Sequence, residues 1–136
     1  MEKFHKLSQG RGAIDFFEDF SKVYDSRPGT NKMFARVMEH YARFSGELLP
    51  IKLESTFKDI KTLADIGGGS GYMSFKICQK FPHIKAINCD LPHLEEVFNE
   101  YIAREDFTDV SDKVSFRSLD FQKEDYPTDV DALMFG

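Results

Sequence analysis

The chain has 136 residues, enough for one domain, and 41% of them are hydrophobic, including 14 Phe, so it can bury one core. Its 18 Lys and Arg against 23 Asp and Glu give a formal net charge of -5, which argues against the basic surface of a nucleic-acid binder. No apolar run is long enough for a membrane span, and the first residues lack the apolar stretch of a secretory signal. We therefore expect a cytoplasmic protein that binds small molecules or other proteins, with no nucleic-acid or membrane partner.

Two amphipathic helices are predicted before residue 51. The first covers residues 13–24, and the segment SRPGT ends it with Pro28 and Gly29. The second begins at Thr30 and ends at Pro50. Its apolar face is formed by Met33, Phe34, Val37, Met38, Tyr41, Phe44 and Leu48. Because such stripes are usually buried, we expect this face to pack into the core of an N-terminal helical segment, residues 1–50.

From residue 51 onward, after a polar connection, short apolar runs alternate with helical segments, which is typical of a parallel sheet with crossover helices. The expected strands are residues 62–66, 86–89, 114–119 and 130–135. The expected helices are residues 72–81 and 94–104, with Pro92 suited to the first turn of the second. The segment 51–136 is therefore predicted to be an α/β, Rossmann-like core. Because only Gly136 follows the fourth strand, we expect that strand at the sheet edge and a chain truncated after it.

The two cysteines fall at no metal-ligand spacing. Cys78 lies in an expected helix and Cys89 in an expected strand, so both are predicted to be reduced core thiols. No metal site is expected.

A glycine-rich loop follows the first strand. Asp65 lies near the end of the strand, and the glycines after it are Gly67, Gly68, Gly69 and Gly71. At the carboxyl edge of an open α/β sheet, missing side chains let a ligand touch the backbone. The dinucleotide fingerprint G-x-G-x-x-G would place its third glycine at Tyr72, so the pattern disfavours an NAD-dependent oxidoreductase. A sharp strand-to-helix turn without a ligand is the alternative interpretation.

Two further acids follow the next two strands. Asp90 could accept hydrogen bonds from both hydroxyls of a ribose, and hydrogen bonds to a charged group contribute roughly 1.5–3 kcal/mol. Asp120 could accept from the amino group of an adenine. Taken alone, Asp90 could equally cap the helix ahead of Pro92. Together with the glycine loop, the acids favour a nucleoside that carries an amino acid.

Four segments occur in a characteristic order: LADIGGGSG, CDLPHLEEV, SLDF and DVDALMF. They resemble the S-adenosylmethionine-binding half of the small-molecule O-methyltransferases, which include plant caffeate and flavonoid enzymes, hydroxyindole O-methyltransferase and bacterial relatives. The resemblance implies a class I methyltransferase sheet, S-adenosyl-L-methionine as cofactor, and methyl transfer to a small hydroxylated acceptor.

The resemblance also implies roles for individual residues at the cofactor. The glycine loop, Gly67 to Gly71, would lie along the methionine part of the cofactor, with Asp65 at the base of the loop. Asp90 would hold the ribose hydroxyls, and Leu91 would lie against the adenine. Asp120 would meet the adenine amino group, and Phe121 would cover the ring face.

The acceptor residues implied by the resemblance lie upstream, in MFARVMEHYA. Phe34 and Met38 match family positions that contact the acceptor, and Tyr41 lies one turn further on. The competing interpretation is that these side chains belong to the core.

Departures from the family pattern limit what this chain is expected to do. Plant members carry a cofactor-binding lysine where Gly136 stands, and the family's histidine base lies just beyond it. We therefore expect no catalytic residue in this chain and little or no methyl transfer by it alone. The family dimerises through an N-terminal domain, which implies a homodimer for the full-length parent. A non-catalytic cofactor-binding or interaction module, or a decayed paralogue, is the alternative.

Overall fold

The computed structural model describes residues 29–135, so the helix predicted at residues 13–24 lies outside the described part. The chain divides into two compact units, Met1–Met33 and Phe34–Gly136, and the second contains the whole sheet. The boundary predicted at residue 50 stays a prediction. Within residues 29–135, no helix has both the length and the apolar character needed to cross a membrane.

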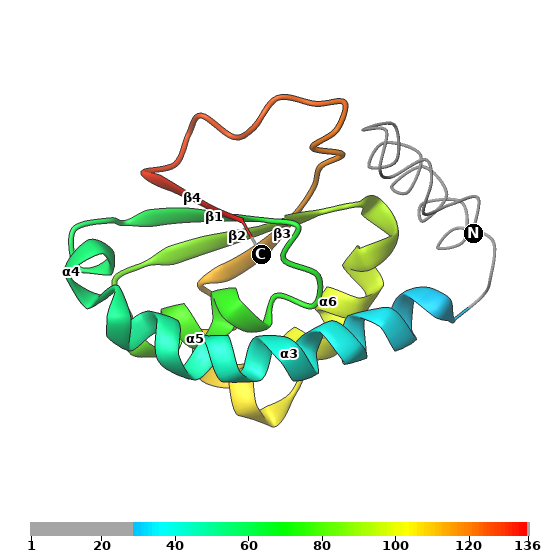
Figure 1. Cartoon of the computed structure of the whole chain (residues 1–136), viewed down its shortest axis with the longest axis horizontal. Helices are drawn as coiled ribbons and strands as arrows, with labels where there is room; N and C mark the ends of the chain where they lie inside the picture. Colours follow the sequence, from blue (N-terminus) through cyan, green and yellow to red (C-terminus); the bar gives the residue numbers. More distant parts are fainter. Residues whose placement is uncertain (1–28, 136) are drawn as a thin grey trace, which may run out of the picture. The chain divides into compact units, whose positions relative to one another are not determined.

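The second unit is built on one sheet of four parallel strands in the order β3-β2-β1-β4 (Figure 1). The strands are β1 (Thr62–Ile66), β2 (Lys85–Asp90), β3 (Val114–Ser118) and β4 (Ala132–Phe135). The predicted parallel α/β sheet and the position of the fourth strand at its edge are confirmed among the described residues. In the register, Asp65 lies between Asn88 of β2 and Met134 of β4.

Helices cover one side of this sheet. They are α3 (Thr30–Lys52), α4 (Glu54–Phe57), α5 (Tyr72–Lys80) and α6 (Glu95–Ile102), with 3-10 turns η1 (Pro92–Leu94) and η2 (Glu105–Val110). Figure 1 shows α3, α5 and α6 below the sheet, while the segment between β3 and β4 passes above it. The opposite face is therefore covered by irregular chain within the described part.

Several element boundaries differ from the predicted ones. Helix α3 continues through Pro50, because a proline in the last turn removes only its own N–H and the Leu53 N–H still donates to the Leu49 carbonyl at 3.0 Å. The polar connection expected after it contains α4. The helix predicted at 94–104 is present as the shorter α6, which ends at Ile102; η1 precedes it, and η2 was not predicted.

The fourth strand begins at Ala132, two residues later than predicted. The reason is Asp131, whose carboxylate accepts hydrogen bonds from the Lys61 and Thr62 N–H groups, each at 2.8 Å. This side chain ties the start of β1 to the chain that enters β4.

The core lies on both sides of the sheet. On the helix side, the ring of Phe75 stacks on those of Phe98 and Phe107, with centroids 5.6 and 4.6 Å apart. On the other side, a cluster is formed by Ala64, Ile66, Cys89 and Leu119, with Ile87 and Val130 packed against it. Cys78 and Cys89 are buried free thiols, as predicted.

The orientation of α3 contradicts the expectation that its apolar stripe is core. Tyr41 and Phe44 are 70% and 75% exposed, and Met38 is 47% exposed. The buried positions instead are Ala35, Glu39, Gly46 and Pro50. Glycine permits this close approach, since a Cβ at Gly46 would lie 2.7 Å from Cε1 of Tyr72 in α5.

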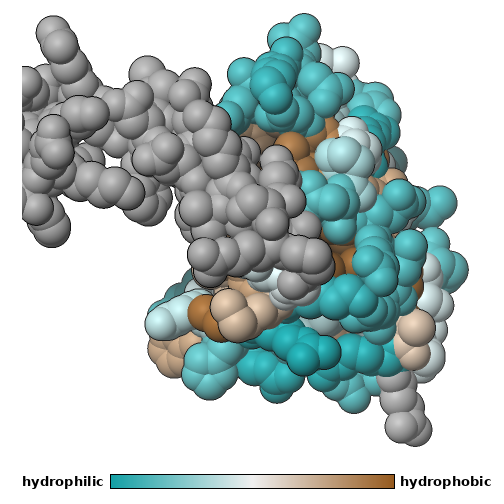
Figure 2. All heavy atoms as spheres, turned by 90° about the vertical axis from the view of Figure 1, so that its right-hand side faces the viewer, coloured by the Kyte–Doolittle hydropathy of each residue, from teal (hydrophilic) through white to brown (hydrophobic). Residues whose placement is uncertain are grey.

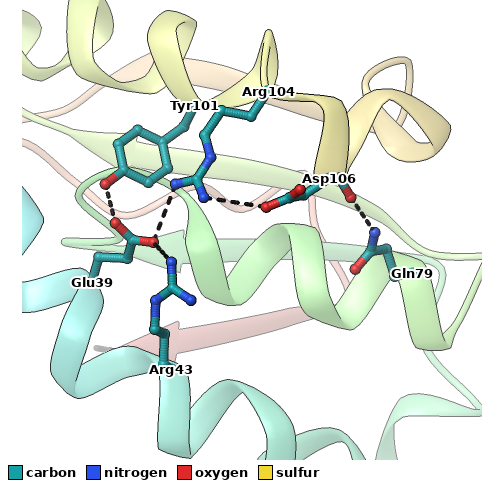
Figure 3. Close-up of polar contacts among 6 residues, drawn as sticks. All are labelled: Glu39, Arg43, Gln79, Tyr101, Arg104 and Asp106. Carbon is teal, nitrogen blue, oxygen red and sulfur yellow. Dashed lines mark hydrogen bonds and ion pairs between the residues drawn. The ribbon is translucent and has the colours of Figure 1, made fainter.

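A buried carboxylate anchors the inner face of α3 to α6 (Figure 3). Glu39 accepts hydrogen bonds from the Tyr101 hydroxyl, from Arg43 at 2.8 Å and from Arg104 at 3.2 Å. Arg104 also pairs with Asp106 of η2 at 3.2 Å. Although burial opposes ionisation, the hydrogen bonds from Tyr101 and Arg43 and the charges of Arg43 and Arg104 lower the pKa of Glu39.

Glu39→Ala is expected to destabilise the fold by roughly 1–3 kcal/mol, because it leaves the buried Tyr101 hydroxyl without its acceptor. The matched control is Glu47→Ala on the same helix, which removes an exposed ion pair with Lys76 and should cost about 0–1 kcal/mol. Urea unfolding at pH 7 measures both. Equal losses would contradict the anchoring role of Glu39.

Candidate functional site

The backbone of the loop between β1 and α5 adopts a conformation that requires glycine. Gly67, Gly69 and Gly71 have φ angles of +76°, +56° and +83°, a region that side-chain-bearing residues rarely adopt. At Gly68 the constraint is space, since a Cβ there would lie 2.0 Å from Oδ1 of Asn88. Substitution at any of these positions would therefore move the loop.

One residue of the loop, Gly69, is bound by β2 through both its backbone N–H and its carbonyl. The Gly69 N–H donates to Oδ2 of Asp90 at 2.8 Å, and Nδ2 of Asn88 donates to the Gly69 carbonyl at 2.9 Å. The Gly67 N–H also donates to the Cys89 carbonyl at 2.8 Å. The conformation of the loop is thus set by three successive residues of the neighbouring strand.

Asp90 lies at the end of β2, as predicted, and is only 8% exposed. Its second oxygen, Oδ1, accepts from the Leu91 N–H at 2.7 Å. The N-cap of η1 is Leu91, without a side-chain cap bond, so the carboxylate serves the loop and not that turn. Burial raises the pKa of Asp90, opposed by the hydrogen bonds from Leu91 and Gly69 and by the nearby His93. Leu91 itself is half-buried beside it.

Asp65 lies beneath the loop and not in the open part of the site. It is the penultimate residue of β1 and 1% exposed, and its Cγ would be 2.8 Å from a Cβ at Gly68. Ser74 of α5 donates to Oδ2 at 3.1 Å, while Oδ1 has no hydrogen-bond partner. Burial raises the pKa of Asp65 to about 7; the Ser74 bond opposes this, and the charge of Asp90 adds to it.

Asp120 and Phe121 reach the same edge of the sheet from the turn after β3. The Leu119 N–H donates to the Asp90 carbonyl at 2.8 Å, which brings this turn beside β2. Asp120 lies two residues past the end of β3, and the hydrogen bond from Lys123, at 2.7 Å, lowers the pKa of its carboxyl. The ring of Phe121 would lie 3.8 Å from a Cβ at Gly67.

The three residues predicted to contact an acceptor share helix α3. Phe34 is half-buried, whereas Met38 and Tyr41 are exposed.

Figure 2 shows the side of the molecule toward which the strands point in Figure 1. On this side hydrophilic residues surround smaller apolar patches. Among residues 29–135, no three His, Cys, Asp or Glu side chains are arranged to hold a metal ion.

Two residues of the site were not predicted. Asn88 binds the loop carbonyl, and Ser74 binds Asp65. Each is a polar side chain that is 0% exposed. A buried polar residue in a short apolar strand is the signal that could have identified Asn88, because such a group needs a specific partner.

Comparisons with known proteins identify the family of the chain. A family model described as the O-methyltransferase domain matches residues 3–136. Caffeic acid 3-O-methyltransferase of Medicago sativa is 36% identical over 102 residues, which are 71% of this chain and 28% of that protein. The enzyme of the same name from Eucalyptus globulus is 35% identical over 89 residues, covering 62% of this chain and 28% of that protein. The chain thus spans less than a third of these relatives.

Solved structures support the fold independently. The mitomycin 7-O-methyltransferase superposes with a TM-score of 0.71 at 19% identity, over 85% of this chain and 32% of that one. Human N-acetylserotonin methyltransferase gives 0.69 at 19% identity, over 85% of this chain and 31% of that one. With the family match covering nearly its whole length, the chain belongs to the O-methyltransferase domain family.

Proposed function

We propose that this chain is the S-adenosyl-L-methionine-binding core of an O-methyltransferase that acts on a small hydroxylated molecule. The observation that carries the proposal is the backbone of Gly69, whose N–H and carbonyl are bound at the sheet edge by Asp90 and Asn88. A loop that served only as a turn would not need two buried polar side chains from the next strand to fix the backbone of one residue.

The relatives support the choice of ligand. The human N-acetylserotonin methyltransferase structure is a complex with SAM, and the PigF structure, with a TM-score of 0.68, holds SAH. The curated relatives include caffeic acid and flavonoid O-methyltransferases, which supports a small hydroxylated acceptor.

The residues present fit such a cofactor. A Cβ at Gly69 would meet nothing within 4 Å, so this side of the loop has room for the methionine part. Each carboxylate oxygen of Asp90 uses one lone pair inside the protein and keeps another for a ribose hydroxyl. Leu91 and Phe121 would flank the adenine, and Asp120 would accept from its amino group.

The bound cofactor would supply an electrophilic methyl group, and the residues of this chain would bind and orient it. Phe34, Met38 and Tyr41 remain candidates for acceptor contacts, and the exposure of Met38 and Tyr41 is compatible with that role. Asp65 is too buried to touch a ligand, so we assign it to the support of the loop.

The site is tested by titrating the chain calorimetrically with S-adenosylhomocysteine. We expect saturable binding and no comparable binding of NAD. Asp90→Ala should raise the dissociation constant roughly 10–100-fold, which corresponds to the loss of one charged hydrogen-bond pair. Asp120→Ala should weaken binding by about 2–10-fold, because its half-buried carboxylate is less desolvated than that of Asp90.

Asp129→Ala is the matched control, since this exposed acid pairs with Arg117 outside the loop. Its affinity should equal that of the parent chain. Thermal unfolding of each variant identifies any loss that comes from misfolding. Absence of binding by a folded parent chain, or equal binding of NAD, would contradict the proposed cofactor.

Stability should also depend on pH through Asp65. Its pKa is raised to about 7 in the folded chain, so between about pH 4 and pH 7 the unfolded state releases a proton that the native state keeps, and stability falls as pH rises. Asp65→Asn keeps the shape and cannot ionise. We expect it to match the parent below the unfolded pKa, at about pH 3.5, and to exceed it by roughly 2–4 kcal/mol at pH 8. A stability difference that stays constant across this range in denaturant unfolding would show that Asp65 is not neutral in the fold.

A further inference from the structure

Two buried oxygen atoms beneath the glycine loop lack a hydrogen-bond donor within the described residues. They are Oδ1 of Asp65 and Oδ1 of Asn88, and these two side chains are 1% and 0% exposed. Buried polar atoms are nearly always paired, because an unpaired one loses its hydration without compensation. The two unpaired oxygens therefore indicate that a donor is still to be assigned at this point of the fold.

The two side chains lie next to each other. Asp65 of β1 and Asn88 of β2 are register partners, and side chains at paired positions of neighbouring parallel strands project from the same face of the sheet. Both reach the space beneath Gly68, where a Cβ would lie 2.0 Å from Oδ1 of Asn88 and 2.8 Å from Cγ and Oδ2 of Asp65. The absence of a side chain at Gly68 thus lets the two polar groups meet.

The orientation of the Asn88 amide is set by the loop. Its Nδ2 donates to the Gly69 carbonyl at 2.9 Å, so Oδ1 is the atom that faces the space shared with Asp65. Oδ2 of Asp65 already accepts from Ser74 at 3.1 Å. If Asp65 is ionised, only acceptors face one another here. A proton on the Asp65 carboxyl supplies the one donor that the pair lacks.

The surroundings of Asp65 favour that proton. Burial raises the pKa of Asp65 to about 7, the hydrogen bond from Ser74 of α5 opposes the rise, and the negative charge of Asp90 of β2 adds to it. A water bridging the two oxygens would also donate to both, but it would leave a desolvated carboxylate beside that of Asp90.

The other elements packed against Asp65 bring no charge that would hold it ionised. Its register partner in β4 is Met134, and the loop above it, residues 67–71, contains only glycines and Ser70. Cys89 of β2 is a neutral thiol near pH 7, because burial raises its pKa to about 11. Among the described residues, no cation contributes to the pKa of Asp65.

Ionisation of Asp65 would favour the opposite orientation of the Asn88 amide. A carboxylate accepts charge-assisted hydrogen bonds, so it would attract Nδ2 of Asn88 in place of Oδ1. The turned amide would withdraw its donor from the Gly69 carbonyl and present an acceptor to it. Gly69 would then keep only the bond from its N–H to Asp90. Because a Cβ at Gly69 meets nothing within 4 Å, this is also the part of the loop that is open to a ligand.

We propose that Asp65 is a positioning residue for the cofactor, which in its protonated form donates to Oδ1 of Asn88 and so keeps the Asn88 amide turned toward Gly69. The inference rests on the proposed function, since the affinity it concerns is that for S-adenosyl-L-methionine and its product. Loss of the proton turns the amide, frees the Gly69 carbonyl and weakens binding.

The proposal makes cofactor affinity depend on pH. Affinity is highest where Asp65 is protonated and falls as pH rises through about 7. By linkage, the ligand then stabilises the protonated form, so binding near neutral pH takes up a fraction of a proton.

Calorimetric titration of the full chain with S-adenosylhomocysteine at about pH 6 and about pH 8.5 tests this dependence. We expect the dissociation constant of the parent chain to rise roughly 3–10-fold between the two. Asp65→Asn cannot ionise, and its amide can donate to Asn88 as the carboxyl does, so its dissociation constant should change less than about twofold. Asp90 and the nearby His93 are unchanged in this variant, so the difference between the two profiles isolates Asp65.

Ser74→Ala supplies a second variant with a signed expectation. It removes the hydrogen bond that opposes protonation of Asp65, so the pH at which affinity falls should move upward. Titration at about pH 7 in buffers of different ionisation enthalpy measures the proton uptake directly, and Asp65→Asn should lower it.

The hydrogen bond itself is tested without a ligand by NMR of the free chain. The carboxyl carbon of Asp65 and the side-chain amide of Asn88 should titrate together, with a midpoint near pH 7. Absence of binding at every pH would contradict the proposed cofactor, and the NMR titration would still decide whether Asp65 controls Asn88. Equal pH dependence of binding in the parent and Asp65→Asn, or an Asn88 amide that does not follow Asp65, would overturn the proposal.

Discussion

The candidate site depends on the backbone of one residue, Gly69, whose N–H and carbonyl are both bound by side chains of β2. Asn88 and Asp90 are two residues apart, so they project from the same face of the strand, one toward the Gly69 carbonyl and the other toward its N–H. Helix α5 starts directly after the loop, where the Phe75 N–H donates to the Gly71 carbonyl. Strand, loop and helix are therefore fixed by the same few contacts, and a ligand bound at the loop would be coupled to the packing of the sheet.

The three acids predicted from strand ends occupy three different environments. Asp65 is enclosed by apolar and polar groups without a cation, and its raised pKa makes the neutral form available near neutral pH. Asp120 is held ionised by Lys123, and Asp90 lies between them, desolvated but stabilised by two backbone N–H groups. The carboxylate of Asp120 thus carries negative charge at the outer part of the site, whereas the carboxyl of Asp65 beneath the loop can be neutral or charged near neutral pH.

The sequence predicted the sheet well because each strand is a short apolar run bounded by polar or glycine residues, and β1 matches its predicted range. The glycine loop could also be predicted, because its positive φ angles demand glycine and so leave a clear mark in the sequence. The orientation of α3 could not be predicted from the sequence. Periodicity identifies an apolar face, but only the contacts of Glu39 and Gly46 reveal that the polar and small face is the buried one. Asn88 was missed because one polar residue in a four-residue run does not change the pattern.

The bond between Asp131 and the start of β1 has a consequence for how the domain forms. The carboxylate joins backbone groups 69 and 70 residues earlier in the chain, and β4 pairs with the same strand. β1 sits between β2 and β4, so one of its edges stays open until the last described strand has been synthesised. Closing so long a loop is entropically costly and slow compared with helix formation. During that interval the unpaired edge of β1 is open to pairing with another molecule, and the arrival of Asp131 and β4 ends this exposure.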